Sequence, residues 1–356
     1  MNRYVFRAAV ATMVILIAAC GGRPTGNQPQ TTATPPPSSP PSRGEPLIWY
    51  SPSSGQMVAL DWSGKHAGQL ALSAYNQTPD GSKLSALGGE VYDVTGKLVG
   101  HTDLTKGPGP VWADDSNHWC TFVAAGTTYG QEGSQKIWLK DPTGGARVVA
   151  TYGTVTGNAG PEILACSLSV DRVVVAQRAF AWVTDVSVFK LSTGARVFQH
   201  SYPAQEMARV LASRDGMFLV EDRSVSGNTG EPGGGTVIRS LTDGQVLAQF
   251  ANLSIIGFSW DGSVALTISD TSRTVAAILW RTNVATWSTP YPADWPQGKP
   301  LVVSVLGRPD GSDLAVAIYR GSTPSNQGVD LWVVTGQHGR RILSGPIVPG
   351  FSTSFF

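Results

Sequence analysis

Short hairpin turns that recur at near-regular intervals constrain the fold of this chain more than any other feature. In residues 255–291, an apolar strand runs into a tight turn at Asp261-Gly262 and a second strand returns from it. A third strand follows, and a turn at Thr282-Asn283 leads to a fourth. Asp-Gly between two apolar runs favours a hairpin because glycine adopts positive φ without steric cost. The stretch therefore predicts one small antiparallel sheet.

The same plan recurs along most of the chain, so the repeats can be counted. The turn between the last two strands of a unit follows an apolar or aromatic strand, and it occurs at Gly55, Gly96, Gly144, Gly194, Gly244, Asn283 and Gly336. The mean spacing of about 47 residues is near that of propeller blades. A second turn, between the first two strands, interleaves with these at Asp80-Gly81, Asp115-Ser116, Val170-Asp171, Asp215-Gly216, Asp261-Gly262 and Asp310-Gly311. Period-two alternation dominates after residue 46, without a convincing amphipathic helix.

These patterns predict an all-β propeller of four-stranded antiparallel blades. Seven blades fit best, and a six-bladed ring with decorated ends is the alternative. Residues 47–62 supply two strands with no first or second strand before them, and residues 349–352 echo the first strand at 256–259. The N- and C-terminal strands are thus expected to share the seventh blade, with one strand missing. The strand–Asp-Gly–strand–Thr-Gly pattern over residues 47–356 resembles WD40-like and TolB-like propellers, although their Gly-His and Trp-Asp pairs are absent. Such a fold implies no particular activity.

The N-terminus indicates export and a lipid anchor. A basic segment with Arg3 and Arg7 precedes a 12-residue apolar run at 8–19. This run is shorter than the roughly 20 residues of a membrane-spanning helix, but it suits a signal peptide. It ends in Ala18-Ala19-Cys20-Gly21, which resembles the lipobox of bacterial lipoproteins. The resemblance implies that residues 1–19 are removed and that Cys20 is acylated, which would anchor the protein at the extracytoplasmic face of the cell membrane. An ordinary secretory signal with an incidental cysteine is the alternative.

Residues 20–46 are expected to form a disordered tether to the folded domain at 47–356. Eight prolines lie between residues 23 and 46, and the segment lacks the apolar residues that would offset the entropy of ordering. Removal of the signal takes away two of 26 basic residues and none of 25 acidic ones, which leaves a net charge of −1. The sequence has no stripe of basic residues that could bind a phosphate backbone, so it predicts no nucleic-acid partner.

Two cysteines remain in the predicted propeller. Cys120 falls on the second strand of one blade and Cys166 on the first strand of the next. An oxidising compartment would favour a disulfide between neighbouring blades, provided that the two Cα atoms lie within about 7 Å. Two buried free thiols are the alternative.

Motifs that carry chemistry are absent from the sequence. It contains no Gly-x-Ser-x-Gly elbow, no phosphate-binding Gly-x-x-x-x-Gly-Lys-Ser/Thr loop and no Gly-x-Gly-x-x-Gly motif. The five histidines stand at least 17 residues apart, so no local pair could ligate a metal, and neither a metal nor a cofactor is expected.

Long irregular loops at 126–133, 224–235, 291–300 and 320–328 are expected to share one face, opposite the short regular turns. Binding residues concentrate on such loops. The candidates are Tyr291, Asp294 and Trp295, with Tyr129 and Glu132 in support. Exposed aromatic rings beside a carboxylate suit a sugar or a peptide, whereas loops that pack their own aromatic rings are the structural alternative.

The sequence therefore predicts a membrane-anchored scaffold that binds an envelope protein, peptide or glycan through this loop face, without catalysis. An extracytoplasmic glycan-active hydrolase or lyase, with residues around the central channel, is the alternative. A cluster of carboxylates, arginine or histidine at the channel mouth would favour the enzyme.

Overall fold

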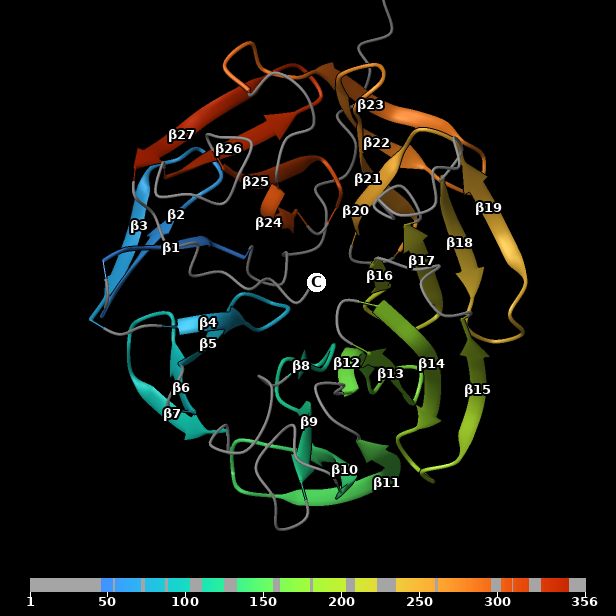
Figure 1. Cartoon of the computed structure of the whole chain (residues 1–356). Helices are drawn as coiled ribbons and strands as arrows, with labels where there is room; N and C mark the ends of the chain where they lie inside the picture. The colour runs from blue at the N-terminus through green and yellow to red at the C-terminus, as the bar shows by residue number, and fades with distance from the viewer. Residues whose placement is uncertain are drawn as a thin grey trace, which may run out of the picture. The chain divides into compact units, whose positions relative to one another are not determined.

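Seven small antiparallel sheets make up the folded unit of the chain, residues 42–356, and they stand side by side in a ring (Figure 1). The computed structural model describes residues 46–53, 55–71, 74–86, 89–102, 111–124, 133–155, 161–179, 182–202, 209–222, 235–259, 262–295, 302–308, 310–319 and 328–345. All regular elements in these ranges are strands. The described residues contain no helix that is long and apolar enough to cross a membrane.

We number the sheets as blades 1–7 in chain order. Blade 1 comprises β1 (Ile48–Ser53), β2 (Gln56–Leu60) and β3 (His66–Leu70), and blade 2 comprises β4 (Ala74–Gln77), β5 (Lys83–Ala86), β6 (Glu90–Asp93) and β7 (Leu98–His101). Blade 3 comprises β8 (Val111–Trp112), β9 (Trp119–Ala124), β10 (Gly133–Lys140) and β11 (Ala146–Val155). Blade 4 comprises β12 (Pro161–Ser167), β13 (Arg172–Ala179), β14 (Trp182–Lys190) and β15 (Arg196–Ser201). Blade 5 comprises β16 (Arg209–Ala212), β17 (Phe218–Asp222), β18 (Thr236–Ser240) and β19 (Val246–Phe250). Blade 6 comprises β20 (Ser254–Phe258), β21 (Val264–Ser269), β22 (Thr274–Leu279) and β23 (Val284–Pro290), and blade 7 comprises β24 (Val302–Gly307), β25 (Asp313–Tyr319), β26 (Val329–Thr335) and β27 (Gly339–Gly345).

The hydrophobic core lies between the blades. Each of its seven clusters among the described residues joins two consecutive blades. The cluster that closes the ring packs Ile48 and Leu60 of blade 1 against Leu331 and Val333 of blade 7, and Arg340 Nη2 of blade 7 donates to the carbonyl of Ser63 in blade 1 at 2.6 Å. The apolar faces of the strands are thus buried on both sides of each sheet. The expected seven-bladed propeller is confirmed, and the six-bladed alternative is excluded.

The turns between the first and second strands lie where the sequence predicts them. Each holds one residue with positive φ, namely Gly81, Ser116, Asp171, Gly216, Gly262 and Gly311. In all six, the amide of this residue donates to the carbonyl three positions earlier, as Gly216 does to Ser213 at 2.8 Å. A short turn of this kind needs a left-handed backbone at one position, and serine or aspartate can replace glycine there.

Blade 1 corrects the prediction for the N-terminal strands. Residues 47–62 were expected to supply two strands, the third and fourth of their blade, joined at Gly55. The structure has a further strand, β3, after a turn at Gly64. The Asp61 carboxylate accepts from the Lys65 amide at 2.9 Å, just as Asp93 accepts from Lys97 at 3.0 Å in the last turn of blade 2. Gly64, not Gly55, therefore marks the last turn. The expected C-terminal strand at 349–352 lies outside the described residues.

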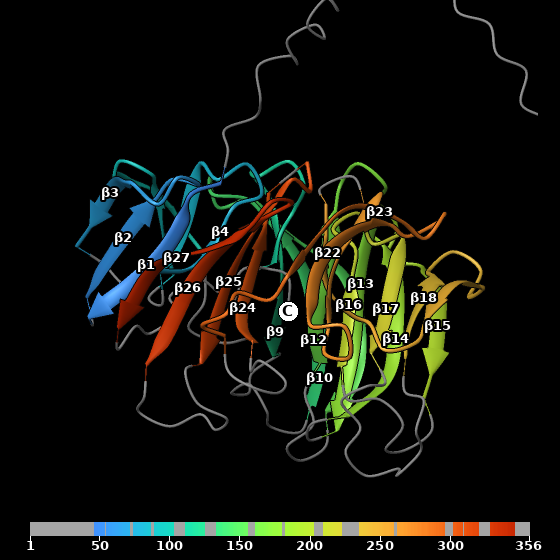
Figure 2. The same cartoon turned by 90° about the horizontal axis from the view of Figure 1, so that it is seen from above.

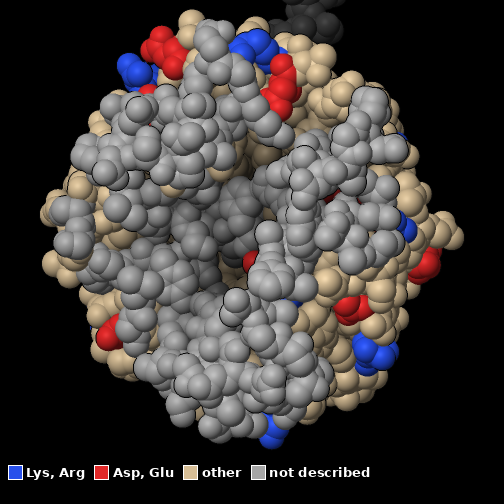
Figure 3. Space-filling model, viewed as in Figure 1, with Lys and Arg blue, Asp and Glu red and all other residues tan. Residues whose placement is uncertain are grey.

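The strands run between two faces of the ring (Figure 2). Because strands alternate in direction, the first–second and third–fourth turns share one face, which we call the turn face. The second–third loops and the crossings between blades share the other, the loop face. First strands such as β12, β16 and β20 lie innermost, and fourth strands such as β15 and β19 lie outermost (Figure 1). On the face seen in Figure 3, the described acidic and basic residues lie scattered, most of them toward the rim, and form no patch of one sign.

Candidate functional site

Tyr291 and Trp295, the leading aromatic candidates, belong to the core between blades 6 and 7. Their side chains are 7% and 2% exposed, and their ring centroids lie 4.8 Å apart. Trp295 also meets Trp332 of β26 edge to face at 6.1 Å. The amide of Trp295 donates to the carbonyl of Pro292 at 2.9 Å, so the chain turns back and inserts the indole between the blades. The expectation that these two rings are exposed contacts was wrong.

Polar contacts fix Tyr291 as well. Its hydroxyl donates to Asp270 Oδ1 at 3.2 Å, and the guanidinium of Arg273 lies over its ring, 5.2 Å from the centroid. Burial, together with the negative charge of Asp270, raises the pKa of the Tyr291 phenol. The phenol therefore stays neutral and serves as a hydrogen-bond donor within its own blade.

Of the three leading candidates, Tyr291, Asp294 and Trp295, it is Asp294 that faces solvent. Its side chain is 60% exposed and lies 3.6 Å from Arg341 Nη2 of β27. Arg341 also approaches Asp330 Oδ2 at 3.5 Å and lies over the ring of Trp332 at 5.7 Å. The crossing from blade 6 to blade 7 thus presents the exposed Asp294–Arg341 pair at the loop face, next to buried aromatic rings.

The other candidates lie outside the described residues. This holds for the lipidation candidate Cys20 and for Tyr129 and Glu132 in the loop between β9 and β10. The loops expected at 224–235 and 320–328 also fall almost wholly outside the described ranges. Their role in binding stays a prediction.

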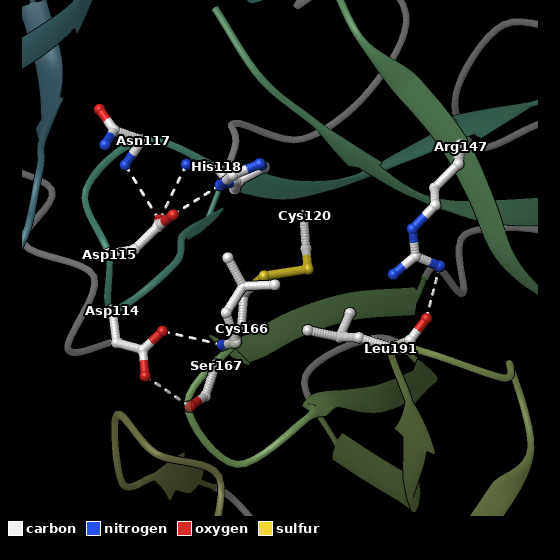
Figure 4. Close-up of a disulfide and its surroundings, with 10 residues drawn as sticks. Asp114, Asp115, Asn117, His118, Cys120, Arg147, Cys166, Ser167 and Leu191 are labelled. Carbon is white, nitrogen blue, oxygen red and sulfur yellow. Dashed lines mark hydrogen bonds and ion pairs between the residues drawn. A yellow bond between two sulfur atoms is a disulfide. The ribbon is translucent and has the colours of Figure 1, made fainter.

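Cys120 and Cys166 form a disulfide in the structure (Figure 4). Their Cα atoms lie 5.9 Å apart and the S–S distance is 2.12 Å. Cys120 belongs to β9 and Cys166 to β12, so the bond joins blades 3 and 4, and both residues are almost fully buried in the cluster shared by those blades. Of the two alternatives left by the sequence, the structure has the disulfide.

Charged residues also gather near the centre of the ring at the turn face. The guanidinium of Arg214, from the first turn of blade 5, interacts electrostatically with Asp114 of blade 3 and Asp80 of blade 2. Burial lowers the pKa of Arg214 to about 9 and the two carboxylates oppose this effect, so the side chain stays protonated at neutral pH. A cluster of carboxylates and arginine near the channel is what the enzyme alternative predicts. The protonation of its two carboxylates therefore needs to be considered.

Both carboxylates are held ionised. Burial would raise the pKa of Asp114, but hydrogen bonds from Ser169, Ser167 and two backbone amides outweigh it and lower the pKa. The pKa of Asp80 is lowered in the same way, with burial opposed by hydrogen bonds from Ser82, Thr78 and Ser116. A general acid at neutral pH needs a raised pKa. Hydrogen bonds of Asp80 and Asp114 to neighbouring blades make these two residues ties between blades 2, 3 and 4.

The sequence analysis did not predict one hydrogen-bond donor position that recurs in the blades. The residue eight positions after the last turn of a blade donates its hydroxyl to a carboxylate in four blades: Tyr152 to Asp185, Tyr202 to Glu221, Tyr291 to Asp270 and Ser344 to Asp330. The constant offset from Gly144, Gly194, Asn283 and Gly336 was the available signal. Tyr152 and Tyr202 donate to the next blade, whereas Tyr291 and Ser344 donate within their own, so the donor position recurs but the place of the carboxylate does not. Among the described residues, no group of three or more His, Cys, Asp or Glu side chains could hold a metal ion.

Comparison with known proteins identifies the fold and no family. No family model matches the sequence, and no curated protein matches it. The structure is similar to the hydrazine synthase of Kuenenia stuttgartiensis, with 13% identity, a TM-score of 0.52, and coverage of 83% of this chain and 93% of that chain.

Two further solved structures show weaker similarity. One is the β-propeller domain of Cps50 (Swd1) from Myceliophteria thermophila, with 11% identity, a TM-score of 0.40, and coverage of 65% of this chain and 66% of that chain. The other is KlHsv2 with loop 6CD replaced by a Gly-Ser linker, with 10% identity, a TM-score of 0.47, and coverage of 85% and 99%. At these identities a likeness shows the fold alone and assigns no activity.

Proposed function

We propose that this protein is a lipid-anchored, extracytoplasmic lipoprotein whose propeller binds an envelope protein, peptide or glycan through its loop face. The observation that carries the proposal is the disulfide between Cys120 and Cys166, because such bonds persist in oxidising compartments and are rare in the cytosol. It supports export, which the basic and apolar N-terminal segment indicates independently. Cys20, in its lipobox-like sequence, then supplies the anchor.

Binding through the loop face is supported by the polar groups that the described residues place there. The charged cluster near the ring centre contains two carboxylates with lowered pKa values that join neighbouring blades, and an arginine that interacts with them electrostatically. The exposed Asp294–Arg341 pair lies beside the buried cluster between blades 6 and 7. A rigid scaffold with polar groups at its loop face suits recognition, since little ordering entropy is lost on binding.

The anchor is tested by producing the full-length protein and its Cys20→Ser variant in a bacterial host with a lipid-analogue label. We expect label and membrane association in the wild type, and loss of both in the variant. An unlabelled, soluble wild-type protein would overturn the anchor.

The binding face is tested by affinity capture from membranes with the full-length protein in detergent. Asp294→Lys should abolish recovery of a partner that the wild type recovers. Asp310→Lys is the matched control, because Asp310 is exposed in the first turn of blade 7, on the turn face. Equal loss with both variants, or turnover of a glycan or peptide library without any partner, would contradict the proposed binding face.

A further inference from the structure

The chain joins the propeller at the turn face. Pro46, the first described residue, is buried between the last turn of blade 1 and the first turn of blade 2. Trp62 Nε1 in the former donates to the Pro46 carbonyl at 3.0 Å. A Cβ built on Gly81 in the latter would lie 2.6 Å from Pro46 Cα. Two turns therefore hold the point at which the preceding residues connect to the ring, and both turns belong to the turn face.

The exposed large apolar residues of the described ranges gather at the same face. They are Val94, Leu98, Val99, Val148, Val170, Val197, Val246, Leu247, Leu279 and Val284. Each lies within four residues of the positive-φ residue of a first or last turn. Single exposed apolar residues scattered over a surface need no explanation. Here all ten lie at one end of the strands, so the turn face has an apolar margin.

The outer strands change in polarity along their length. Beside its turn, β15 exposes Val197, and toward the loop face it exposes Gln199 and Ser201. In the same way, β19 exposes Val246 beside its turn and Gln249 farther along. Both ends of these strands lie at the outside of the ring, so core packing does not require the difference. It fits a ring whose turn face meets a less polar medium than its loop face does.

Exposed cations accompany the apolar margin. Six of the seven blades carry one in or beside the last turn, namely Lys65, Lys97, Arg147, Arg196, Arg281 and Arg340. The carboxylates of the same turns are less exposed and accept from backbone amides of their own turn, as in Asp61, Asp93 and Asp141. Among the described turn residues, exposed carboxylates belong to Asp115, Asp243 and Asp310. The exposed charge of the last turns is thus predominantly positive.

We propose that the turn face lies against an anionic phospholipid surface and that the loop face is directed away from it. The exposed apolar and basic residues of the two lists above form the contact, which we call the turn-face rim. Aliphatic side chains can enter the boundary between headgroups and acyl chains, and lysine and arginine bind lipid phosphates. The tether joins the ring on this face, so an anchor at Cys20 would bring the rim to the membrane.

This inference rests on the proposed anchor only for the means of attachment. The rim supplies a few dispersed side chains, so it orients a tethered protein and does not replace the lipid. An acyl chain and a basic surface are the two signals that together give stable membrane attachment. With the turn face against lipid, the Asp294–Arg341 pair on the loop face is presented to partners in the envelope.

The orientation is tested with the full-length protein attached through Cys20 to vesicles of phosphatidylcholine and phosphatidylglycerol that carry a headgroup quencher. Where Cys20 bears no lipid, its thiol is coupled to a maleimide lipid, so the orientation is measured in either case. A fluorescent amino acid replaces Ala195, in the last turn of blade 4, or Ala251, in the crossing from blade 5 to blade 6. Both alanines are exposed. We expect several-fold stronger quenching at position 195 than at position 251.

Three lysine variants test the rim itself. Lys65→Gln and Lys97→Gln should each lower the ratio of the turn-face-down to the loop-face-down orientation about fivefold, because each removes one cation from the anionic surface. Lys136→Gln is the matched control, since Lys136 lies toward the loop-face end of β10, and it should leave the ratio unchanged. Equal quenching at positions 195 and 251, stronger quenching at 251, or an equal effect of all three variants would each overturn the proposal. A need for the maleimide lipid would count against acylation of Cys20 alone.

Discussion

At the scale of single residues, Asp114 shows how one carboxylate joins two blades. It follows β8 of blade 3, and its oxygens accept hydrogen bonds from the Ser167 hydroxyl at 2.8 Å and the Leu168 amide at 2.8 Å in blade 4. The amide of Ser169 donates at 3.2 Å, and its hydroxyl donates as well. Because these donors favour the charged form, the pKa of Asp114 is lowered although burial opposes this.

We expect Asp114→Asn to lower the free energy of unfolding by about 1–3 kcal/mol at pH 7, since hydrogen bonds to a charged group are lost. A carboxyl with a lower pKa in the folded state stabilises the fold above its unfolded pKa, and this contribution disappears as pH falls through the folded pKa. The difference from wild type should therefore shrink below a pH of about 4. Denaturant unfolding at pH 7, 5 and 3 measures it. Asp294→Asn, with an exposed carboxylate, should stay near wild type; an equal difference for Asp114→Asn at all three values would contradict the assignment.

Trp295 carries the second prediction at this scale. Its indole is 2% exposed between Tyr291 and Trp332, so Trp295→Ala should leave a cavity and lower the free energy of unfolding by about 3–5 kcal/mol. Asp294→Ala, at the adjacent exposed position, should change it by less than about 0.5 kcal/mol. Guanidinium unfolding followed by circular dichroism compares the two. If Trp295→Ala were as stable as wild type, Trp295 would be a surface contact after all.

At the scale of elements, the last turns of the blades differ in how closely they approach a neighbouring blade. Gly144 and Gly194 end equivalent turns in blades 3 and 4 and both have positive φ, at 94° and 71°. A Cβ built on Gly144 meets no atom within 4 Å, whereas one on Gly194 would lie 2.0 Å from the carbonyl oxygen of Val149. Only the second glycine allows two backbones to meet.

This contrast gives a matched pair of variants. Gly144→Ala should cost about 1–2 kcal/mol, because alanine is strained at positive φ. Gly194→Ala carries a similar strain and must also separate β11 from the turn, so its total cost should be larger by about 1–3 kcal/mol. Thermal unfolding of both variants in one buffer measures the difference. Equal losses would show that blades 3 and 4 can separate here without cost.

Elements also show what could be inferred from the sequence. The six first turns are visible because Asp-Gly and its equivalents must take positive φ wherever a turn is this short. β3 escapes detection because four of its five residues are not buried, so it lacks an apolar alternation. Tyr291 and Trp295 were read as exposed because loop residues usually are. Their burial depends on the turn at Pro292 and on blade 7, which is distant in sequence.

At the scale of the whole molecule, each blade is stabilised by both of its neighbours. Closure through Ile48, Leu331 and their cluster turns a linear array of repeats into a ring, and in a closed ring no blade can separate without breaking two interfaces. The interface between blades 3 and 4 carries an additional covalent bond, which closes a loop across a sequence separation of 46 residues. Loss of this bond should therefore weaken the ring as one cooperative unit.

Replacement of both Cys120 and Cys166 by alanine tests this cooperativity. The chain entropy of the unfolded state predicts a loss of about 4 kcal/mol for a loop of this length. Unfolding should remain a single transition, with a denaturant slope equal to or slightly above that of the wild type, because the unfolded chain without the cross-link is less compact and exposes more surface. A reductant should lower the stability of the wild type toward that of the variant and leave the variant unchanged. Alkylation without reductant should leave both wild-type cysteines unmodified by mass. Two separate transitions in the variant would mean that blades 3 and 4 unfold independently, and that the disulfide, more than ring closure, makes the propeller cooperative.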